Sequence, residues 1–358
     1  ATATNALAIG SSATASADGA YAAGLLATAS GTNAMALGTN SKATNVDSYA
    51  AGFKSSALGN SAMAFGSFAN ASAANSYAAG HQASAAAINS MAFGTGSSAT
   101  GLDSMAVGFQ SIATAPNSAA IGTSSFANAI NSFAAGVGAR ALAINSLAFG
   151  SGASATGETG AAIATGSTAV GQNSLAIGGF AYANGTDSTA VGFQARTNSA
   201  NDLAIGTYSV AGGPYATAIG TQSNSQGQDA LAIGVNSKAI GVNAVAIGTG
   251  AIATGNNAFA IGANAKANGD DSFAFGDGAT TTQRANEALV TGTDAFASGS
   301  DASAYGVSSK ALSANAYAYG SFSVAMGPNS IASGTNSAAT RDNAVAFGTE
   351  STSRSDDA

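Results

Sequence analysis

The sequence contains no cysteine, no tryptophan, one histidine and only three prolines in 358 residues. The lack of cysteine excludes disulfides, thiolate metal sites and cysteine nucleophiles. Charged residues make up 8% of the chain and aromatic residues 7%, so little large apolar surface is available for one wide globular core. These shortages favour a thin core that is repeated many times.

Basic residues are also scarce, since 10 Lys and Arg stand against 17 Asp and Glu and give a formal net charge of −7. Nucleic-acid binders neutralise phosphates with basic residues, so we expect no nucleic-acid partner. No apolar run approaches the roughly 18 residues of a membrane helix, and we expect no direct membrane contact from this segment. The low charge and the mean hydropathy of +0.19 argue against disorder.

What the sequence does contain is a repeat of 14 residues. Residues 5–10, NALAIG, return in related form along the whole chain, for example as NAVAFG at 343–348. The glycines that close this motif are 14 residues apart with two exceptions: Ala164 occupies one glycine position, and Gly276 and Gly292 are 16 residues apart. The chain therefore has 25 repeats, of which 24 close with glycine.

We number the positions of each repeat from 1, so that the closing glycine is position 6. Position 4 is almost always alanine, positions 3 and 5 carry the large residues, position 9 is Ser or Ala, and position 11 is mostly Ala. Alternation at positions 2–5 and 8–11, with glycine and Asn or Asp between, predicts two short strands per repeat. A helix is excluded because glycine recurs every repeat, and each glycine in the interior of a helix lowers helix stability by about 1 kcal/mol.

Fourteen residues are too few for a three-sided coil built from six-residue sides, so each repeat is predicted to be a two-sided coil. The fold class is therefore an all-β parallel solenoid, with strands of successive coils about 4.8 Å apart. Position 1 is mostly Asn or Asp. We expect these side chains to bond their own backbone in Asx turns rather than to hold a metal.

The side-chain volumes suggest which face lies inside. Because packed sheets are about 10 Å apart, large residues at positions 3 and 5 are expected to point inward, opposite positions 9 and 11. The alanines of position 4 would then form a smooth outer face that another copy of the chain covers. This predicts an oligomer interface made by Ala8, Ala36, Ala64, Ala106, Ala148, Ala176, Ala204, Ala246 and Ala274.

Position 10 varies more than its neighbours and is predicted to point outward. Six of the ten basic residues lie there, together with aliphatic and aromatic residues. One interpretation is a plain solvent face, on which lysine discourages lateral sheet pairing. The other is a multivalent ligand-contact stripe that includes Lys42, Ile112, Phe126, Arg140, Tyr182, Arg196, Lys238, Ile252, Lys266 and Lys310.

The repeat, Asn-Ser-x-Ala-φ-Gly (φ apolar) followed by a strand with Ser and Ala at alternate positions, resembles the YadA-like head of trimeric autotransporter adhesins. The resemblance covers Asn5 to about Gly348. It implies a left-handed parallel β-roll of 14-residue coils, a homotrimer, and a bacterial surface fibre that an outer-membrane anchor outside this chain would hold. The implied function is attachment to host matrix proteins, cells, other bacteria or abiotic surfaces.

The repeat pattern also suggests the boundaries. We expect a head over residues 1–350, with irregular coils near 151–178 and 277–292, and a polar tail at 351–358 that leads toward a neck.

A catalytic interpretation finds no support in the sequence. The single histidine, His81, lies at a turn position without a matching partner, and no cluster of acids and bases shares one depth of the solenoid. We therefore expect no enzyme activity, no catalytic residue, no cofactor and no metal. The alternatives to adhesion are an ice-binding solenoid, for which position 10 has threonine only intermittently, and a purely structural spacer.

Overall fold

In the computed structural model, which describes residues 1–357, every regular element in that range is a β-strand. Each coil contributes a three-residue strand at positions 3–5 and a two-residue strand at positions 10–11. We call the three-residue strands sheet A and the two-residue strands sheet B. Contacts divide the chain into two units, Ala1–Phe180 and the part from Ala181 onward. The two-strand coil predicted from the sequence is confirmed.

In the first unit, sheet A contains β1 Leu7–Ile9, β3 Tyr21–Ala23, β5 Met35–Leu37, β7 Tyr49–Ala51, β9 Met63–Phe65, β11 Tyr77–Ala79, β13 Met91–Phe93, β15 Met105–Val107, β17 Ala119–Ile121, β19 Phe133–Ala135, β21 Leu147–Phe149, β23 Ala161–Ile163 and β25 Leu175–Ile177. Sheet B of this unit contains β2 Thr14–Ala15, β4 Thr28–Ala29, β6 Lys42–Ala43, β8 Ser56–Ala57, β10 Asn70–Ala71, β12 Ser84–Ala85, β14 Ser98–Ala99, β16 Ile112–Ala113, β18 Phe126–Ala127, β20 Arg140–Ala141, β22 Ser154–Ala155 and β24 Thr168–Ala169.

In the second unit, sheet A contains β27 Thr189–Val191, β29 Leu203–Ile205, β31 Thr217–Ile219, β33 Leu231–Ile233, β35 Val245–Ile247, β37 Phe259–Ile261, β39 Phe273–Phe275, β41 Leu289–Thr291, β43 Ser303–Tyr305, β45 Tyr317–Tyr319, β47 Ile331–Ser333 and β49 Val345–Phe347. Sheet B of this unit contains β26 Tyr182–Ala183, β28 Arg196–Thr197, β30 Val210–Ala211, β32 Asn224–Ser225, β34 Lys238–Ala239, β36 Ile252–Ala253, β38 Lys266–Ala267, β40 Thr280–Thr281, β42 Phe296–Ala297, β44 Lys310–Ala311, β46 Val324–Ala325, β48 Ala338–Ala339 and β50 Thr352–Ser353.

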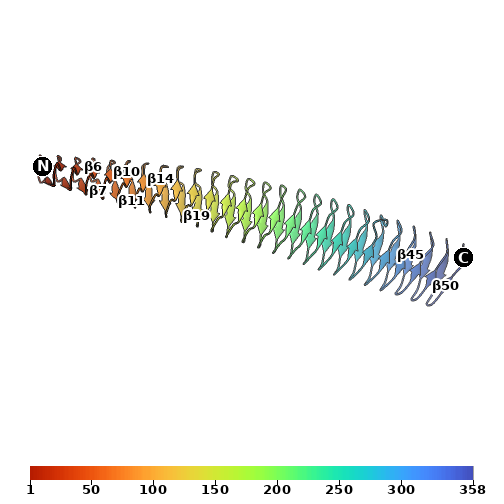
Figure 1. The fold of residues 1–358 in the computed structure, drawn as a ribbon. Coiled ribbons are helices and arrows are strands. Elements are labelled where there is room, and N and C mark those ends of the chain that lie inside the picture. The colour runs from red at the N-terminus through yellow and green to blue at the C-terminus, as the bar shows by residue number, and fades with distance from the viewer. Residues whose placement is uncertain (358) are drawn as a thin grey trace. The chain divides into compact units, whose positions relative to one another are not determined.

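Within each unit, successive coils pair in parallel with a register of one repeat (Figure 1). Leu7 of β1 lies opposite Tyr21 of β3, and Thr14 of β2 lies opposite Thr28 of β4. Equivalent positions of neighbouring coils therefore form columns along the sheets. A pattern within one repeat becomes a continuous surface in each unit.

Tight turns connect the two strands of a coil at both corners. The backbone N–H of Ala13 donates to the carbonyl of Gly10 at 3.3 Å, and that of Ala34 to the carbonyl of Gly31 at 3.1 Å. The third residues of these turns, Ser12 and Asn33, have φ of 53° and 56°. Such four-residue turns bring their ends within about 7 Å, which is closer than two ordinary packed sheets.

This narrow coil makes the predicted inside and outside of sheet A wrong. Positions 2, 4, 9 and 11 face the interior, and positions 3 and 5 face outward. The Thr197 hydroxyl of position 11, for example, donates to the Ser188 hydroxyl of position 2 at 3.0 Å across the core. Tight turns leave room only for small side chains between the sheets, chiefly Ala, Ser and Thr, so the large residues cannot be inside.

The predicted interface alanines are corrected for the same reason. They lie in the core of a single chain and are not available to a second copy. Ala8, in the first coil, is partly exposed. The other eight have no exposed surface: Ala36, Ala64, Ala106, Ala148, Ala176, Ala204, Ala246 and Ala274.

Most serines at positions 2 and 9 satisfy their buried hydroxyl locally; the exceptions among the described residues, whose hydroxyls have no hydrogen-bond partner, are Ser104, Ser174 and Ser323. The Ser48 hydroxyl donates to the Asn45 carbonyl at 2.7 Å, and the Ser41 hydroxyl donates to the Gly38 carbonyl at 2.9 Å. A buried hydroxyl without such a partner would cost about 1–3 kcal/mol. Alanine and serine are therefore interchangeable at these two positions.

Position 1 behaves differently from the predicted Asx turn. Its residues adopt positive φ, and their side chains bond from coil to coil. The amide of Asn75 donates to Asn89 at 3.1 Å, and the amide of Asn89 donates to Asp103 at 2.8 Å. Asn and Asp suit this column because they tolerate the left-handed conformation and can pass hydrogen bonds along it.

The closing glycine is required by both conformation and space. Gly122 has φ of 124°, and a Cβ atom there would lie 2.6 Å from the carbonyl oxygen of Gly136 in the next coil. Neighbouring coils thus pack backbone against backbone at this corner. A side chain would separate them.

The two coils expected to be irregular keep their strand pairing. Phe149 lies opposite Ile163 and Ile163 opposite Ile177 around the Ala164 coil. The two additional residues near 277–292 are absorbed in the turn between β40 and β41, because Phe273 still lies opposite Leu289. The register survives since both changes fall at corners and not in strands.

The division into a head at 1–350 and a tail at 351–358 remains a prediction. Strand pairing continues into β50, where Thr352 lies opposite Ala338. Residue 358 lies outside the described residues.

Replacing Ala164 by glycine is expected to stabilise the chain by about 1 kcal/mol. Ala164 has φ of 103°, close to the 108–139° that the closing glycines occupy. Relief of this conformation, worth about 1–3 kcal/mol, exceeds the roughly 0.5–1 kcal/mol that glycine loses through the unfolded state. Thermal unfolding measures the change. Ala162→Gly, at a core position without positive φ, should instead lower the stability of the chain. A lower thermal unfolding midpoint for Ala164→Gly would contradict backbone strain at Ala164.

Candidate interaction surfaces

The outward face of sheet A is apolar and carries no charge. None of the residues at positions 3 and 5 is Asp, Glu, Lys or Arg. In one chain these side chains remain half-buried or exposed, and Phe93 of β13 is 51% exposed. A continuous apolar face of this extent marks a surface that another molecule covers.

Aromatic side chains strengthen the continuity of this face. The ring of Phe65 lies 4.9 Å from Tyr49 and 5.7 Å from Tyr77, centroid to centroid. In the second unit Tyr305 and Tyr319 stack at 5.0 Å. Burial raises the pKa of the Tyr319 phenol, and the neighbouring tyrosines add to that shift. The rings of this face therefore already pack against each other within one chain.

The structure places all ten residues of the predicted stripe on the outward face of sheet B. Lysines and arginines of this column are exposed and the apolar members are half-buried. They do not form one uninterrupted series. Adjacent strands bring together three groups, which are Ile112 with Phe126 and Arg140, Tyr182 with Arg196, and Lys238 with Ile252 and Lys266. Lys42 and Lys310 lie apart from these groups.

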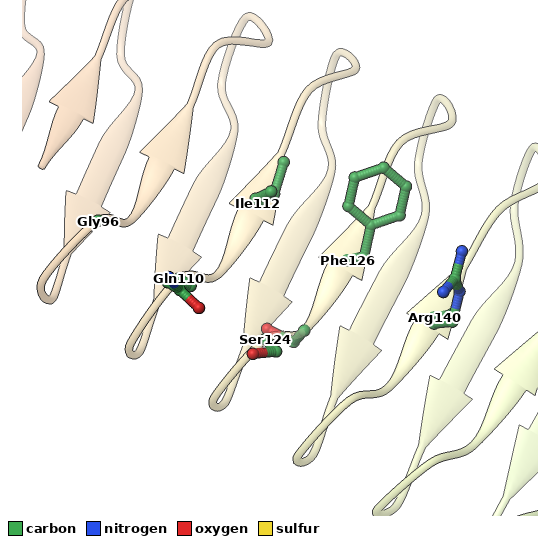
Figure 2. A pocket seen from close by; sticks show the side chains of 7 residues that line it. Gly96, Gln110, Ile112, Ser124, Phe126 and Arg140 are labelled. Carbon is green, nitrogen blue, oxygen red and sulfur yellow. The ribbon is translucent and has the colours of Figure 1, made fainter.

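The first of these groups borders a shallow depression of about 520 Å³. Figure 2 shows Ile112, Phe126 and Arg140 on successive coils of one face, with Gln110 and Ser124 on the turns beside them. The guanidinium carbon of Arg140 lies 5.9 Å from the centroid of the Phe126 ring. Apolar, cationic and hydrogen-bonding groups therefore meet in one place.

A second exposed cluster was missed by the sequence reasoning. Phe53 and Phe68 lie on turns after sheet A, with ring centroids 5.3 Å apart, and the ammonium group of Lys54 is 5.3 and 5.4 Å from the two rings. The ring of His81 is 6.0 Å from Phe68. Large residues at positions 7 and 8, where Ser, Thr and Gly are common, are the signal that could have revealed it.

One buried carboxylate occurs where most coils have Ser or Ala. Asp202, at position 2, is 1% exposed. It accepts hydrogen bonds from the backbone N–H of Ser199 at 2.8 Å and of Ala216 at 3.1 Å. Burial raises its pKa, and these hydrogen bonds lower it in part. The carboxylate joins two neighbouring coils and has a structural role.

Within residues 1–357 the structure has no group of three or more His, Asp or Glu side chains suited to a metal ion. No helix of the described chain is long and apolar enough to cross a membrane. His81 contacts an aromatic ring at the surface. The candidate functional groups of the described residues lie on extended surfaces.

Such surfaces on a repetitive β-solenoid define a class of binding protein whose contacts are distributed over many coils. The family model YadA head domain repeat (2 copies) matches most of the chain, at residues 1–27, 15–41, 29–48, 43–69, 71–97, 99–125, 127–153, 141–174, 169–195, 198–223, 225–251, 253–279, 314–330 and 327–351. The chain therefore belongs to this family and is a YadA-like head of a trimeric autotransporter adhesin. No curated protein matches the chain significantly.

Family and fold together point to a structural adhesin and not to an enzyme. They imply the bacterial cell surface as its location. The 16-residue coil lies partly in the stretch 280–313, which the family model does not match.

Proposed function

We propose that this chain is the adhesive head of a surface fibre and that three copies assemble through the outward face of sheet A. The observation that carries the proposal is the contrast between the two outward faces. Sheet A presents an uncharged apolar face, whereas sheet B presents the exposed cations of position 10. Membership of the head family supports the trimer and the adhesive role.

In this arrangement sheet A faces the centre of the trimer and sheet B faces the surroundings. Burial of the half-exposed residues at positions 3 and 5 would give each chain the wide core that its alanine interior lacks. Segments outside this chain would anchor the fibre in the outer membrane. The ligands are host matrix proteins, cell surfaces or abiotic surfaces that contact sheet B.

Adhesion through sheet B would be multivalent. Each coil offers a small contact, and three stripes on one trimer add through effective concentration. Lys238 and Lys266 lie two strands apart on sheet B, about 10 Å along the unit. Cations with this spacing favour attachment to an acidic surface. The apolar members of the column contribute to attachment at any ionic strength.

Removal of stripe residues tests this function. The pair Lys238→Ser and Lys266→Ser is expected to reduce attachment to acidic matrix proteins several-fold and to remove most of its salt dependence. The pair Tyr182→Ser and Ile252→Ser is expected to weaken attachment at every salt concentration. Attachment of the purified trimer is measured on coated surfaces between low and physiological salt.

A matched control removes two exposed charges outside the column, with Arg341→Ser and Arg354→Ser. Equal losses in this control would mean that net charge alone drives attachment. Unchanged attachment after replacement of the whole stripe would leave sheet B a plain solvent face, and the chain would then be a spacer. Thermal hysteresis of the purified protein would instead favour ice binding.

A further inference from the structure

The depression beside Ile112, Phe126 and Arg140 is a bounded site within the column. On the same face, position 10 is Ser98 in the preceding coil and Ser154 in the following one. Three large side chains thus stand between two small ones. The strands β16, β18 and β20 that carry them span about 10 Å, which is the scale of one or two sugar rings.

On the turns beside this group, position 8 carries Gln110 and Ser124 in two successive coils. The coils on either side have glycine at this position, Gly96 before them and Gly138 after them. Gly138 has no atom within 4 Å of where a Cβ would be. The polar side chains of Gln110 and Ser124 therefore line the depression, with room on either side for a ligand that extends along the turn.

Arg140 is a solitary cation. It is the only Lys or Arg between Lys54 and Arg196, and among the described residues it forms no ion pair. The acids nearest in sequence, Asp103 and Glu158, occupy positions 1 and 14 at the other corner of the coil. Its guanidinium packs near Phe126 and keeps its donor groups available for an anion.

We propose that these residues bind a sugar ring that carries a carboxylate. The planar guanidinium of Arg140 would hold the carboxylate with two parallel hydrogen bonds. The side chains of Ile112 and Phe126 would contact the apolar C–H groups of the ring. The Gln110 amide and the Ser124 hydroxyl would exchange hydrogen bonds with ring hydroxyls. This inference rests on the proposed function, because it needs the outward face of sheet B to contact ligands.

An extended peptide fits this site less well than a sugar. A peptide strand binds by adding to unpaired backbone groups at a sheet edge. Here the backbone groups are already used between coils: the N–H of Ile112 donates to Ser125 at 2.9 Å, and that of Phe126 donates to Ala139 at 2.8 Å. Only side chains remain to recognise a ligand, and their chemistry matches an acidic sugar.

The test uses the intact chain with sodium glucuronate and, as the neutral counterpart, glucose. Ligand-observed magnetic resonance titrations are expected to show glucuronate binding at least tenfold more tightly than glucose, and more weakly as salt rises. Equal binding of both sugars, or no binding of glucuronate, would overturn the proposal. Binding of an aspartate-containing peptide in place of glucuronate would also overturn it.

Variants locate the site. Arg140→Gln is expected to weaken glucuronate binding at least tenfold and to leave glucose binding unchanged, whereas Phe126→Ser weakens both. Serine already occupies this column in neighbouring coils, so the fold accepts it. Arg341→Gln makes the same change at an exposed arginine outside the column and should have no effect. If it lowers binding as much as Arg140→Gln, the site is not discrete.

The outcomes also separate this inference from the proposed function. A trimer that attaches to matrix proteins but ignores glucuronate contradicts only the sugar site. A trimer that binds glucuronate through Arg140 but attaches to no surface contradicts the adhesive function.

Discussion

Ala106→Leu is expected to lower the stability of the folded chain by about 3 kcal/mol. Ala106 is at position 4 of β15, has no exposed surface and faces the narrow space between the sheets. Leucine would add three carbon atoms where tight turns at both corners prevent the sheets from separating, and overpacking of this kind costs about 1–3 kcal/mol or more. Urea unfolding at fixed protein concentration measures the loss, and hydrogen exchange should be fastest near β15.

Ser98→Leu is the matched control, because Ser98 is at position 10 of β14 and points outward. Its effect should remain within about 0.5 kcal/mol, as for other surface substitutions. If Ala106→Leu dissociates the oligomer and leaves the unfolding of the single chain unchanged, alanine faces a neighbouring copy. That result would restore the arrangement expected from the sequence and contradict the structure.

Phe93→Asp is expected to convert the trimer to monomers. Phe93 lies on the outward face of sheet A with 51% of its surface exposed in one chain. In the proposed trimer three carboxylates would enter an apolar interface without partners, and each uncompensated charge costs several kcal/mol. Light scattering should show a fall from three times the chain mass of 33.8 kDa to one. Circular dichroism should still show β structure.

Phe296→Asp makes the same change on β42 of sheet B and should leave the trimer intact. Phe296 is at position 10, on the opposite outward face. A trimer that survives Phe93→Asp would exclude sheet A as the interface. A wild-type chain that is a stable monomer would remove the proposed assembly altogether.

The repeat length and punctuation were sufficient to predict the coil. Glycine at position 6 and Asn or Asp at position 1 recur at the corners, where positive φ is needed. The strands at positions 3–5 and 10–11 follow from alternation between those corners. Local conformation can be read from local sequence because only a few residue types accept such turns.

The outward direction of position 10 was also predictable, since Lys238 and Arg140 could not lie in a thin core. The 14-residue spacing also predicts which members of the column lie on adjacent strands. It does not predict the depression beside Phe126, because that depression depends on the adjoining turn. The cluster around Phe53 and Phe68 was not predicted, because its aromatic residues lie at turn positions where Ser, Thr and Gly are common.

The sequence by itself determined the two-strand coil, the stacking register and the family of this protein, because each depends on residues that recur every 14 positions. Only the tertiary structure decided which of the two faces of sheet A lies inside. Alternation places Ala106 and Met105 on opposite faces but does not say which one is inner. The distance between the sheets decides that, and four-residue turns set it too short for anything larger than a small side chain, with Val290 the largest that is fully buried.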